Sequence, residues 1–302
     1  MNFNNINDVI NNLKDAFIII SNKLNEIDPL TSGKIVSKNE SDDDVKKLDL
    51  YANDILLDIL KKNKNVRIIA SEENKDLIYT ENKNGEYLIS FDPLDGSSNI
   101  DSNITTGTIF CIFKADNIKD KKFNETILCS GYCLYGGCTQ LIYTIKDNKT
   151  PIVNNYILEN RIKFIKKEDI KMPNYGKIYS INESNKYKWD NNKKYNELID
   201  EFIKKGYTQR YVGSLVADAH RTLLKGGFFS YPLNKDKTGK IRVLYEAIPM
   251  CFLIEQAGGH GFLNLSGEKW SDKKFPDNIH EKTSITLCSK YEQSMIEYYI
   301  IM

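Results

Sequence analysis

Apolar residues recur along this chain with two different periods, and the alternation between them predicts a mixed α/β protein. Residues 8–27 and 44–60 place apolar side chains three and four positions apart, which predicts two amphipathic helices. Residues 66–70, 87–91 and 104–113 are short runs of β-branched, aliphatic and aromatic residues, which predict strands. The pattern therefore indicates helices packed on a sheet at the start of the chain.

The later part of the chain repeats this alternation. Residues 127–145 predict a pair of strands that turn at Gly136-Gly137. Residues 146–171 are charged, rich in asparagine and without a clear period, and we place a domain boundary near residue 172. Beyond it, the pattern predicts strands at 177–181, 228–232 and 284–289, and helices after Ser214, at 249–257 and at 291–302.

Composition and charge limit the classes of function. The 302 residues include 42 Lys and Arg against 41 Asp and Glu, so the net charge of +1 gives no reason to expect nucleic acid or a membrane surface as a partner. The start lacks the pattern of a signal peptide, and the apolar run at 17–20 is too short to cross a bilayer. None of the six cysteines forms a C-x-x-C pair, so we expect buried, reduced thiols in a cytoplasmic protein.

The run FDPLDGSSNID at residues 91–101 concentrates residues suited to phosphate chemistry. It follows a predicted strand, and Gly96, Ser97 and Ser98 turn the chain so that backbone N–H groups become free. Such a turn at a helix N-terminus binds phosphate oxygens. An ordinary solvated Asp-Pro and Asp-Gly turn is the alternative reading of the same residues.

Carboxylates gather around this run. Asp92 and Asp95, with the Leu94 carbonyl between them, supply hard oxygen ligands, which favour Mg²⁺ or Mn²⁺. Glu72-Glu73 ends another predicted strand, and adjacent carboxylates repel unless a cation holds them together. Asp49 falls on the apolar face of the helix predicted at 44–60, where a carboxylate needs a partner or a function. A metal site beside a phosphate site is the apparatus of phosphoryl transfer to water.

In combination, these motifs resemble the class I fructose-1,6-bisphosphatases, which are magnesium-dependent sugar phosphatases, and the resemblance covers nearly the whole chain. It implies an α/β fold of layered α-β-α-β-α type with two mixed-sheet subdomains. Residues 1–172 would form the metal-binding subdomain, which is the family's AMP domain, and residues 173–302 the sugar-phosphate-binding subdomain. The implied reaction is hydrolysis of the 1-phosphate of D-fructose 1,6-bisphosphate, a step of gluconeogenesis.

The resemblance also implies roles for individual residues. Asp49 and Glu73 would accept the proton of the attacking water, and Asp43, in a loop expected at 31–44, would approach when that loop closes over the metals. Arg210 would reach a neighbouring subunit, which implies a dimer or tetramer. The implied Mg²⁺ ligands, for which Mn²⁺ is a possible substitute, are Glu72, Glu73, Asp92, Leu94, Asp95 and Glu246. The implied substrate contacts are Asp95, Gly96, Ser97, Ser98, Asn182, Arg210, Tyr211, Gly213, Ser214, Leu215, Tyr231, Lys240 and Arg242. 

Three charged residues in the second half of the chain are spaced regularly. Lys240, Arg242 and Glu246 stand at i, i+2 and i+6, so on a strand they would share one face, although the family has a helix from about Glu246.

Some positions depart from the family's pattern. The acidic Glu86 stands where a basic residue is expected, Lys114 stands where an arginine is expected, and residues 11–13 lack an expected glycine-rich turn. An acid facing the nucleotide phosphate would repel it, so we expect weak or absent control by AMP. Asn185 replaces a tyrosine that would touch the far phosphate, and the nearest tyrosine is Tyr187.

Three other functions stay open on the sequence. Sedoheptulose-1,7-bisphosphatase uses the same fold and motifs and is the nearest rival. An inositol-phosphate or nucleotide 3′-phosphatase fits the metal motifs but not the match in the second half. A non-catalytic descendant is disfavoured because all six site carboxylates are present, namely Asp49, Glu72, Glu73, Asp92, Asp95 and Glu246.

Overall fold

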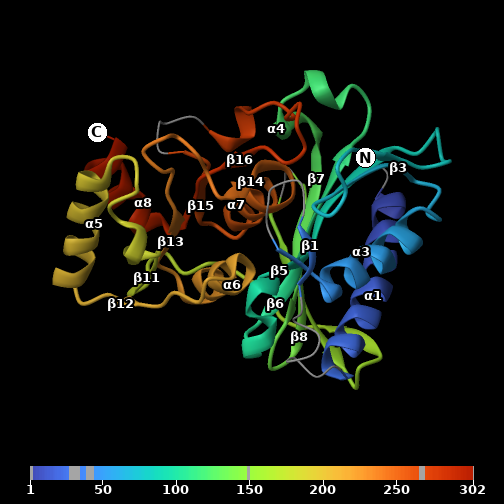
Figure 1. Ribbon diagram of the computed structural model, residues 1–302, viewed down its shortest axis with the longest axis horizontal. Coiled ribbons are helices and arrows are strands. Elements are labelled where there is room, and N and C mark those ends of the chain that lie inside the picture. The colour runs from blue at the N-terminus through green and yellow to red at the C-terminus, as the bar shows by residue number, and fades with distance from the viewer. Residues whose placement is uncertain (1–2, 27–34, 39–43, 148–149, 265–268, 302) are drawn as a thin grey trace.

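The computed structural model arranges the chain in five layers, α-β-α-β-α, as the resemblance predicts (Figure 1). It describes residues 3–26, 35–38, 44–147, 150–264 and 269–301. No helix in these ranges is both long and apolar enough to cross a bilayer.

The first layer consists of α1 (Phe3–Glu26) and α3 (Lys47–Leu60), which lie side by side in Figure 1. The expected start of the second helix at residue 44 is wrong, because Asp44–Lys46 forms strand β2, which pairs antiparallel with β1 (Ile35–Lys38). The loop expected at 31–44 is accordingly wrong at residues 35–38.

The second layer is an eight-stranded sheet in the order β10-β9-β8-β7-β6-β5-β3-β4. Among the described strands of this sheet, only β3 and β5 are parallel neighbours. The strands β9 and β10 were not predicted from the sequence. Most residues of β9 are half-buried and β10 is a short segment with a lysine at each end, so neither shows a clear alternation of apolar and polar residues. The bounds are β3 (Val66–Ser71), β4 (Ile78–Tyr79), β5 (Tyr87–Asp95), β6 (Thr106–Lys114), β7 (Ile127–Tyr135), β8 (Thr139–Ile145), β9 (Val153–Glu159) and β10 (Lys163–Lys166).

The two faces of this sheet bury different helices. Along β5, Ile89 and Phe91 belong to the apolar cluster of α1 and α3, whereas Leu88 belongs to the cluster that contains α6 (Leu215–Lys225) and α7 (Ile248–Gln256). The alternation follows from the pleat of a strand, which sends successive side chains to opposite faces. The sheet therefore holds the first and third layers together.

The fourth layer is a five-stranded sheet in the order β12-β11-β13-β17-β15, and α5 (Asn192–Lys204) and α8 (Lys290–Ile296) cover its outer face (Figure 1). Phe228 belongs to the apolar cluster of α5 and α8, and Phe229 to the cluster of α6 and α7, so this sheet is also buried on both faces. The bounds are β11 (Ile178–Ser180), β12 (Thr208–Gln209), β13 (Phe228–Tyr231), β15 (His260–Phe262) and β17 (Ile285–Cys288).

Short elements complete the fold. They are α4 (Phe123–Thr126), the ladder of β14 (Ile241–Arg242) with β16 (Lys282–Thr283), and the helical turns η1 (Ser97–Ser102), η2 (Ile118–Asp120), η3 (Glu183–Asn185), η4 (Val243–Ala247), η5 (Trp270–Asp272) and η6 (Glu297–Ile301).

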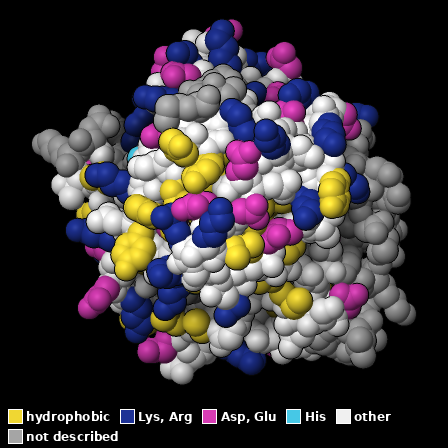
Figure 2. Space-filling model, turned by 90° about the vertical axis from the view of Figure 1, so that its left-hand side faces the viewer, with side chains coloured by type: hydrophobic (Ala, Val, Ile, Leu, Met, Phe, Trp, Pro, Cys, Tyr) yellow, Lys and Arg dark blue, Asp and Glu magenta, His cyan; other side chains and the backbone are white. Residues whose placement is uncertain are grey.

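The division near residue 172 stays a prediction; residue 172 lies between β10 and β11, the strands that end one sheet and begin the other along the chain. Five cysteines are buried as expected, but Cys138 is exposed, because the turn between β7 and β8 carries it into solvent. The end of the molecule around α5 and α8 shows positive, negative and scattered apolar side chains intermixed (Figure 2).

Candidate active site

The FDPLDGSSNID run forms the end of β5 and the turn into η1. Proline donates no N–H to a ladder, so Pro93 is expected to end the pairing of β5. That expectation is wrong, because pairing with β6 is irregular after Asp92 but resumes where Asp95 faces Gly107. Thr108 Oγ1 donates a hydrogen bond of 2.8 Å to the Pro93 carbonyl and steadies the irregular segment. The break in register lets Asp92 and Asp95 come from one strand and still meet in space.

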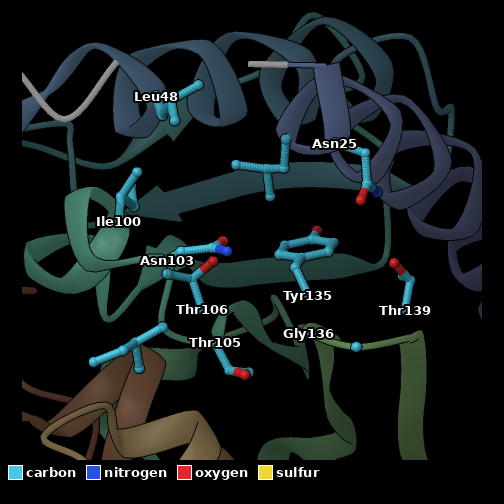
Figure 3. Close-up of a pocket in the computed structure, with 12 residues that line it drawn as sticks. Asn25, Leu48, Ile100, Asn103, Thr105, Thr106, Tyr135, Gly136 and Thr139 are labelled. Carbon is cyan, nitrogen blue, oxygen red and sulfur yellow. The ribbon is translucent and has the colours of Figure 1, made fainter. Parts of the chain in front are cut away.

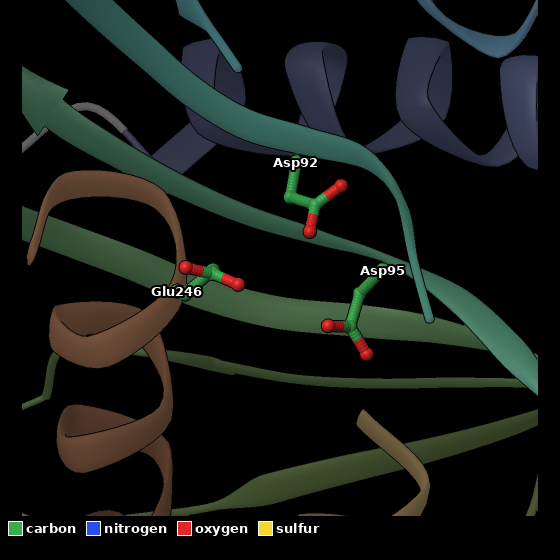
Figure 4. A group of neighbouring side chains, drawn as sticks. All are labelled: Asp92, Asp95 and Glu246. Atoms are coloured by element: carbon green, nitrogen blue, oxygen red, sulfur yellow. The ribbon is translucent and has the colours of Figure 1, made fainter. Parts of the chain in front are cut away.

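Three buried carboxylates form the centre of the site. One oxygen each of Asp92, Asp95 and Glu246 lies within 4.8 Å of the others (Figure 4). Asp92 and Asp95 come from β5, and Glu246 comes from η4, the π-helical turn that leads into α7. The expectation of one strand face for Lys240, Arg242 and Glu246 is therefore wrong, because β14 ends at Arg242.

The electrostatics of this cluster favour a bound cation. Burial raises the pKa of Asp95 to about 7 and that of Glu246 to about 8, and the neighbouring charge of Glu72 acts in the same direction on both. Burial, together with Glu72, Asp95 and Glu246, also raises the pKa of Asp92. Carboxylates crowded in this way repel each other unless a positive charge joins them. Their donor atoms are all hard oxygens, which fits Mg²⁺ or Mn²⁺.

Arg242 supplies a positive charge from within the chain. Its Nη2 lies 2.8 Å from Glu72 Oε1, its Nη1 lies 3.9 Å from Glu246 Oε2, and its backbone N–H donates to Glu246. Arg242 is buried, so these ion pairs are shielded from water. The structure thus places a predicted substrate contact against two predicted metal ligands, and it brings Glu72 to the edge of the cluster.

The other predicted catalytic residues lie on adjoining elements. Asp49 is buried in the first turn of α3. Glu73 follows β3, and its backbone N–H donates to Ser71 Oγ at 3.2 Å. Leu94 lies between the two aspartates, and its N–H donates to Asp92 Oδ1 at 2.9 Å. Asp43 lies outside the described residues.

Two turns suited to phosphate meet beside the carboxylates. Asp95 Oδ2 accepts the Val216 N–H at 2.7 Å and the Ser214 hydroxyl at 3.2 Å, so the aspartate caps the N-terminus of α6. Gly96 has a φ of 79°, and a Cβ there would lie 2.6 Å from Ser214 Oγ. Only glycine can combine this backbone conformation with such a close contact to Ser214. The turn at Gly96, Ser97 and Ser98 therefore adjoins the one at Gly213, Ser214 and Leu215.

A second polar group is formed by the loop before α6, the end of β13 and the residue before β14. The hydroxyls of Tyr211 and Tyr231 share a short hydrogen bond, and Lys240 Nζ lies 5.5 Å from the centre of the Tyr231 ring. Burial raises the pKa of Tyr211, and a hydrogen bond with the Asn182 side chain acts in the opposite direction with a smaller effect. Arg210 is exposed, and its guanidinium donates to the Gln209 carbonyl at 3.1 Å.

Asp218 is a site residue that the sequence analysis missed. It is fully buried on α6, where it accepts the backbone N–H groups of Val212 and Gly213 at 3.0 to 3.1 Å and the Ser180 hydroxyl at 3.0 Å. It also pairs with Arg221. Asp218 thereby fixes the loop that carries Arg210 and Tyr211. An acid on the apolar side of a predicted helix was the signal that could have revealed it.

A pocket beside the first layer lies away from the carboxylate cluster. It has a volume of about 390 Å³ and is bounded by Leu24 and Asn25 of α1, Leu48 of α3 and Ile100 of η1, with Tyr135 on a further side (Figure 3). None of the predicted site residues lines it. The chemistry of the chain is therefore concentrated at the carboxylate cluster and the turns around α6.

Five layers, a buried carboxylate cluster and two adjoining turns suited to phosphate indicate a phosphatase, an enzyme that hydrolyses phosphate esters. A family model described as "Fructose-1-6-bisphosphatase, N-terminal domain" matches residues 2–169, and one described as "Fructose-1-6-bisphosphatase, C-terminal domain" matches residues 172–300. The chain belongs to the fructose-1,6-bisphosphatase family.

Individual relatives agree with this assignment. The class 1 fructose-1,6-bisphosphatase of Sulfurihydrogenibium sp. is 41% identical over 273 residues, which cover 88% of this chain and 82% of that protein. The cytosolic fructose-1,6-bisphosphatase of Arabidopsis thaliana is 41% identical over 266 residues, covering 83% and 75%. The crystal structure of Leishmania major fructose-1,6-bisphosphatase in holo form matches with a TM-score of 0.89 at 30% identity, covering 99% of this chain and 95% of that one.

Proposed function

We propose that this protein hydrolyses the 1-phosphate of D-fructose 1,6-bisphosphate to fructose 6-phosphate and phosphate, with Mg²⁺ as its metal and Mn²⁺ as a substitute. The observation that carries the proposal is the meeting of Asp92, Asp95 and Glu246 within 4.8 Å, beside the N-terminus of α6. Membership of the family supports the choice of substrate, and gluconeogenesis is the process in which this reaction serves. The relative named as cytosolic supports the same compartment for this chain.

Asp92, Asp95 and Glu246 would hold the Mg²⁺, with Glu72, Glu73 and the Leu94 carbonyl as further ligands. When bound, the metal polarises the phosphate and acidifies a water molecule. The identity of the metal rests on the all-oxygen donor set, which suits a hard divalent ion.

The chain itself supplies the remaining chemistry. The N–H groups of the turn at 96–98 and of the α6 N-terminus bind the phosphoryl oxygens, where negative charge builds in the transition state. Asp49 and Glu73 accept the proton of the attacking water, and Asp43 assists them. Burial of Asp49 supports a functional role, because a carboxylate inside a protein needs a partner.

The Tyr211, Tyr231 and Lys240 group binds the distant phosphate. Its lysine and two hydroxyls offer donors to an anion, and Asn182 stands beside Tyr211. Arg210, exposed at the loop that Asp218 fixes, would contribute to the site of a second subunit. We therefore propose a homo-oligomer, dimer or tetramer.

A substrate panel tests this function. The purified protein, freed of metal and then given Mg²⁺, is expected to release phosphate from fructose 1,6-bisphosphate with the highest kcat/KM of the panel. Sedoheptulose 1,7-bisphosphate and inositol 1-phosphate are the comparison substrates. A higher kcat/KM on the seven-carbon sugar would transfer the proposal to sedoheptulose-1,7-bisphosphatase, and no Mg²⁺-dependent release from any bisphosphate would refute both.

A further inference from the structure

His280 connects two segments that carry predicted metal ligands. It lies between η5 and β16, and its Nδ1 is 2.8 Å from the hydroxyl of Tyr245, whereas its Nε2 is 3.1 Å from the carbonyl oxygen of Asn74. Tyr245 directly precedes Glu246, and Asn74 directly follows Glu73. Asn74 is 206 residues away from His280 in the chain, so one side chain joins the first half of the molecule to the second.

The hydrogen-bond chemistry fixes the direction of both contacts. A carbonyl oxygen only accepts, so Nε2 of His280 must carry the proton that goes to Asn74. In the neutral ring, Nδ1 is then the acceptor, and the Tyr245 hydroxyl donates to it. Tyr245 has no exposed surface, and a buried hydroxyl needs such a partner. Both ring nitrogens of His280 are therefore used.

The same network continues to α3. Asn53 Nδ2 donates to Asn74 Oδ1 at 3.2 Å, and Ser71 Oγ donates to Asn53 Oδ1 at 2.7 Å. Asn53 stands one helical turn after Asp49, on the same helix. Hydrogen bonds thus tie together three elements that bear site carboxylates, which are α3, the turn after β3 and η4.

We propose that His280 is a positioning residue of the metal site: it holds the turn of Glu72 and Glu73 against the turn of Glu246. This inference rests on the proposed function. Carboxylates that repel one another separate unless the backbone is held, and losing a group that orients metal ligands commonly weakens metal binding by roughly 10- to 100-fold. His280 touches neither carboxylate in any described contact, and acts through Asn74 and Tyr245.

Three variants test the proposal by direct metal binding. Mn²⁺ is titrated into the metal-free protein, and free Mn²⁺ is measured by electron paramagnetic resonance. His280→Asn reaches only the position of Nδ1 and is expected to weaken Mn²⁺ binding about tenfold. His280→Gln can place an N–H near the position of Nε2 and is expected to restore most of the affinity. Tyr245→Phe removes the other contact and is expected to weaken binding as well.

Steady-state kinetics provide a second measurement. His280→Asn is expected to raise the Mg²⁺ concentration for half-maximal phosphate release by the same factor as the Mn²⁺ dissociation constant, with KM for fructose 1,6-bisphosphate unchanged at saturating Mg²⁺. His260→Asn, the same change on β15 near Lys290 and Glu297, is the matched control and should leave both values unaltered.

The outcomes separate the two proposals. A wild-type protein that neither binds Mn²⁺ nor releases phosphate would refute the proposed function. A wild type that does both, alongside folded His280→Asn with unchanged Mn²⁺ affinity, would refute the role of His280. If His280→Asn does not fold, His280→Gln and Tyr245→Phe decide: equal and wild-type affinities in both would overturn the proposal.

Discussion

Asp95 at the end of β5 accepts the backbone N–H of Val216, at 2.7 Å, and thereby caps a helix that begins 120 positions later in the chain. Oδ2 of Asp95 also accepts a hydrogen bond from the Ser214 hydroxyl, just before α6, and a carboxylate oxygen of Asp95 takes part in the cluster with Asp92 and Glu246. A movement of Asp95 would consequently disturb the cluster and the N-terminus of α6 together.

Replacing Asp95 by asparagine should abolish turnover while keeping the fold. The amide oxygen can still accept the Val216 N–H, but the negative charge that would bind the cation is gone. We expect kcat for phosphate release to fall by at least about 100-fold. Asp58→Asn, an exposed change on α3, is the control and should retain full activity. Near-normal activity of Asp95→Asn at ordinary Mg²⁺ would contradict the metal assignment.

Gly96→Ala should damage stability and activity together. The new Cβ would stand 2.6 Å from Ser214 Oγ, and φ at this position is 79°, which disfavours any residue with a side chain. We expect a loss of about 1 to 3 kcal/mol in the free energy of unfolding. Denaturant melts measure it, and Gly137→Ala, where a Cβ meets nothing within 4 Å, should cost far less. Equal losses in both variants would argue against the close approach.

Much of the fold and the acidic residues could be predicted from local pattern. The apolar period of α1 reveals its buried face, and the continuous apolar run of α7 indicates a helix that is buried on most sides. The FDPLDGSSNID run reveals Asp92 and Asp95, because residues typical of a turn and residues typical of metal ligands follow one another in it. Glu246 could be named only by resemblance, since nothing in its neighbourhood shows that η4 points a carboxylate at β5.

Other features depend on tertiary contacts that no local pattern records. The place of Asp218 on the apolar side of its helix signals that it needs a partner, but its partners, the N–H groups of Val212 and Gly213, are set by the folded loop. His280 is a lone histidine in an irregular segment, and its partner Asn74 lies in the other half of the chain. The strands β9 and β10 were missed because sheet pairing, not hydrophobicity, specifies them.

Stability should fall in mildly acidic solution because of His220. Burial lowers the pKa of this residue to about 4, from an ordinary value of 6.5, and its Nδ1 lies 2.8 Å from the Tyr132 hydroxyl. Below pH 6.5 the His220 ring of the unfolded chain therefore binds a proton, whereas the ring of the folded chain binds it only when the pH falls to about 4. Above pH 6.5 the ring is neutral in both states and does not change the free energy of unfolding. As the pH falls from 6.5 to 4, the free energy of unfolding decreases, by up to about 3 kcal/mol.

Urea melts between pH 7 and 4 measure this loss. His220→Gln cannot take up a proton, so its stability should depend less steeply on pH over the same range. A variant with the wild-type slope would show that carboxylates, and not His220, dominate the acid sensitivity.

Divalent cations should stabilise the folded protein. A cation bound by Asp92, Asp95 and Glu246 offsets their mutual repulsion and is absent from the unfolded chain. At 100 times the dissociation constant, Mn²⁺ is expected to add about 2.7 kcal/mol to the free energy of unfolding, and a chelator should reverse it. Glu246→Gln should lose most of the gain from Mn²⁺, because it removes one of the three carboxylates. An equal Mn²⁺ gain in this variant would place the cation elsewhere.

AMP should not inhibit this protein at micromolar concentration. The first residue of β5, Tyr87, is paired in register with Lys114, and Glu86 directly precedes it. Burial, and after it the charge of Glu86, raises the pKa of Tyr87 to about 12. A second carboxylate, Asp8 of α1, accepts the amides of Asn63 and Asn65 at 3.0 Å each. Acids in these positions repel a nucleotide phosphate.

The measurement is phosphate release from fructose 1,6-bisphosphate during an AMP titration, with Mg²⁺ held constant. Half-inhibition in the micromolar range would contradict this expectation. Glu86→Lys reverses the charge at the position in question and should lower the AMP concentration needed for inhibition, whereas Glu81→Lys, an exposed acid shortly before β5, should leave it unchanged. The comparison separates a local repulsion at Glu86 from a general effect of net charge, because both variants change the charge of the chain equally.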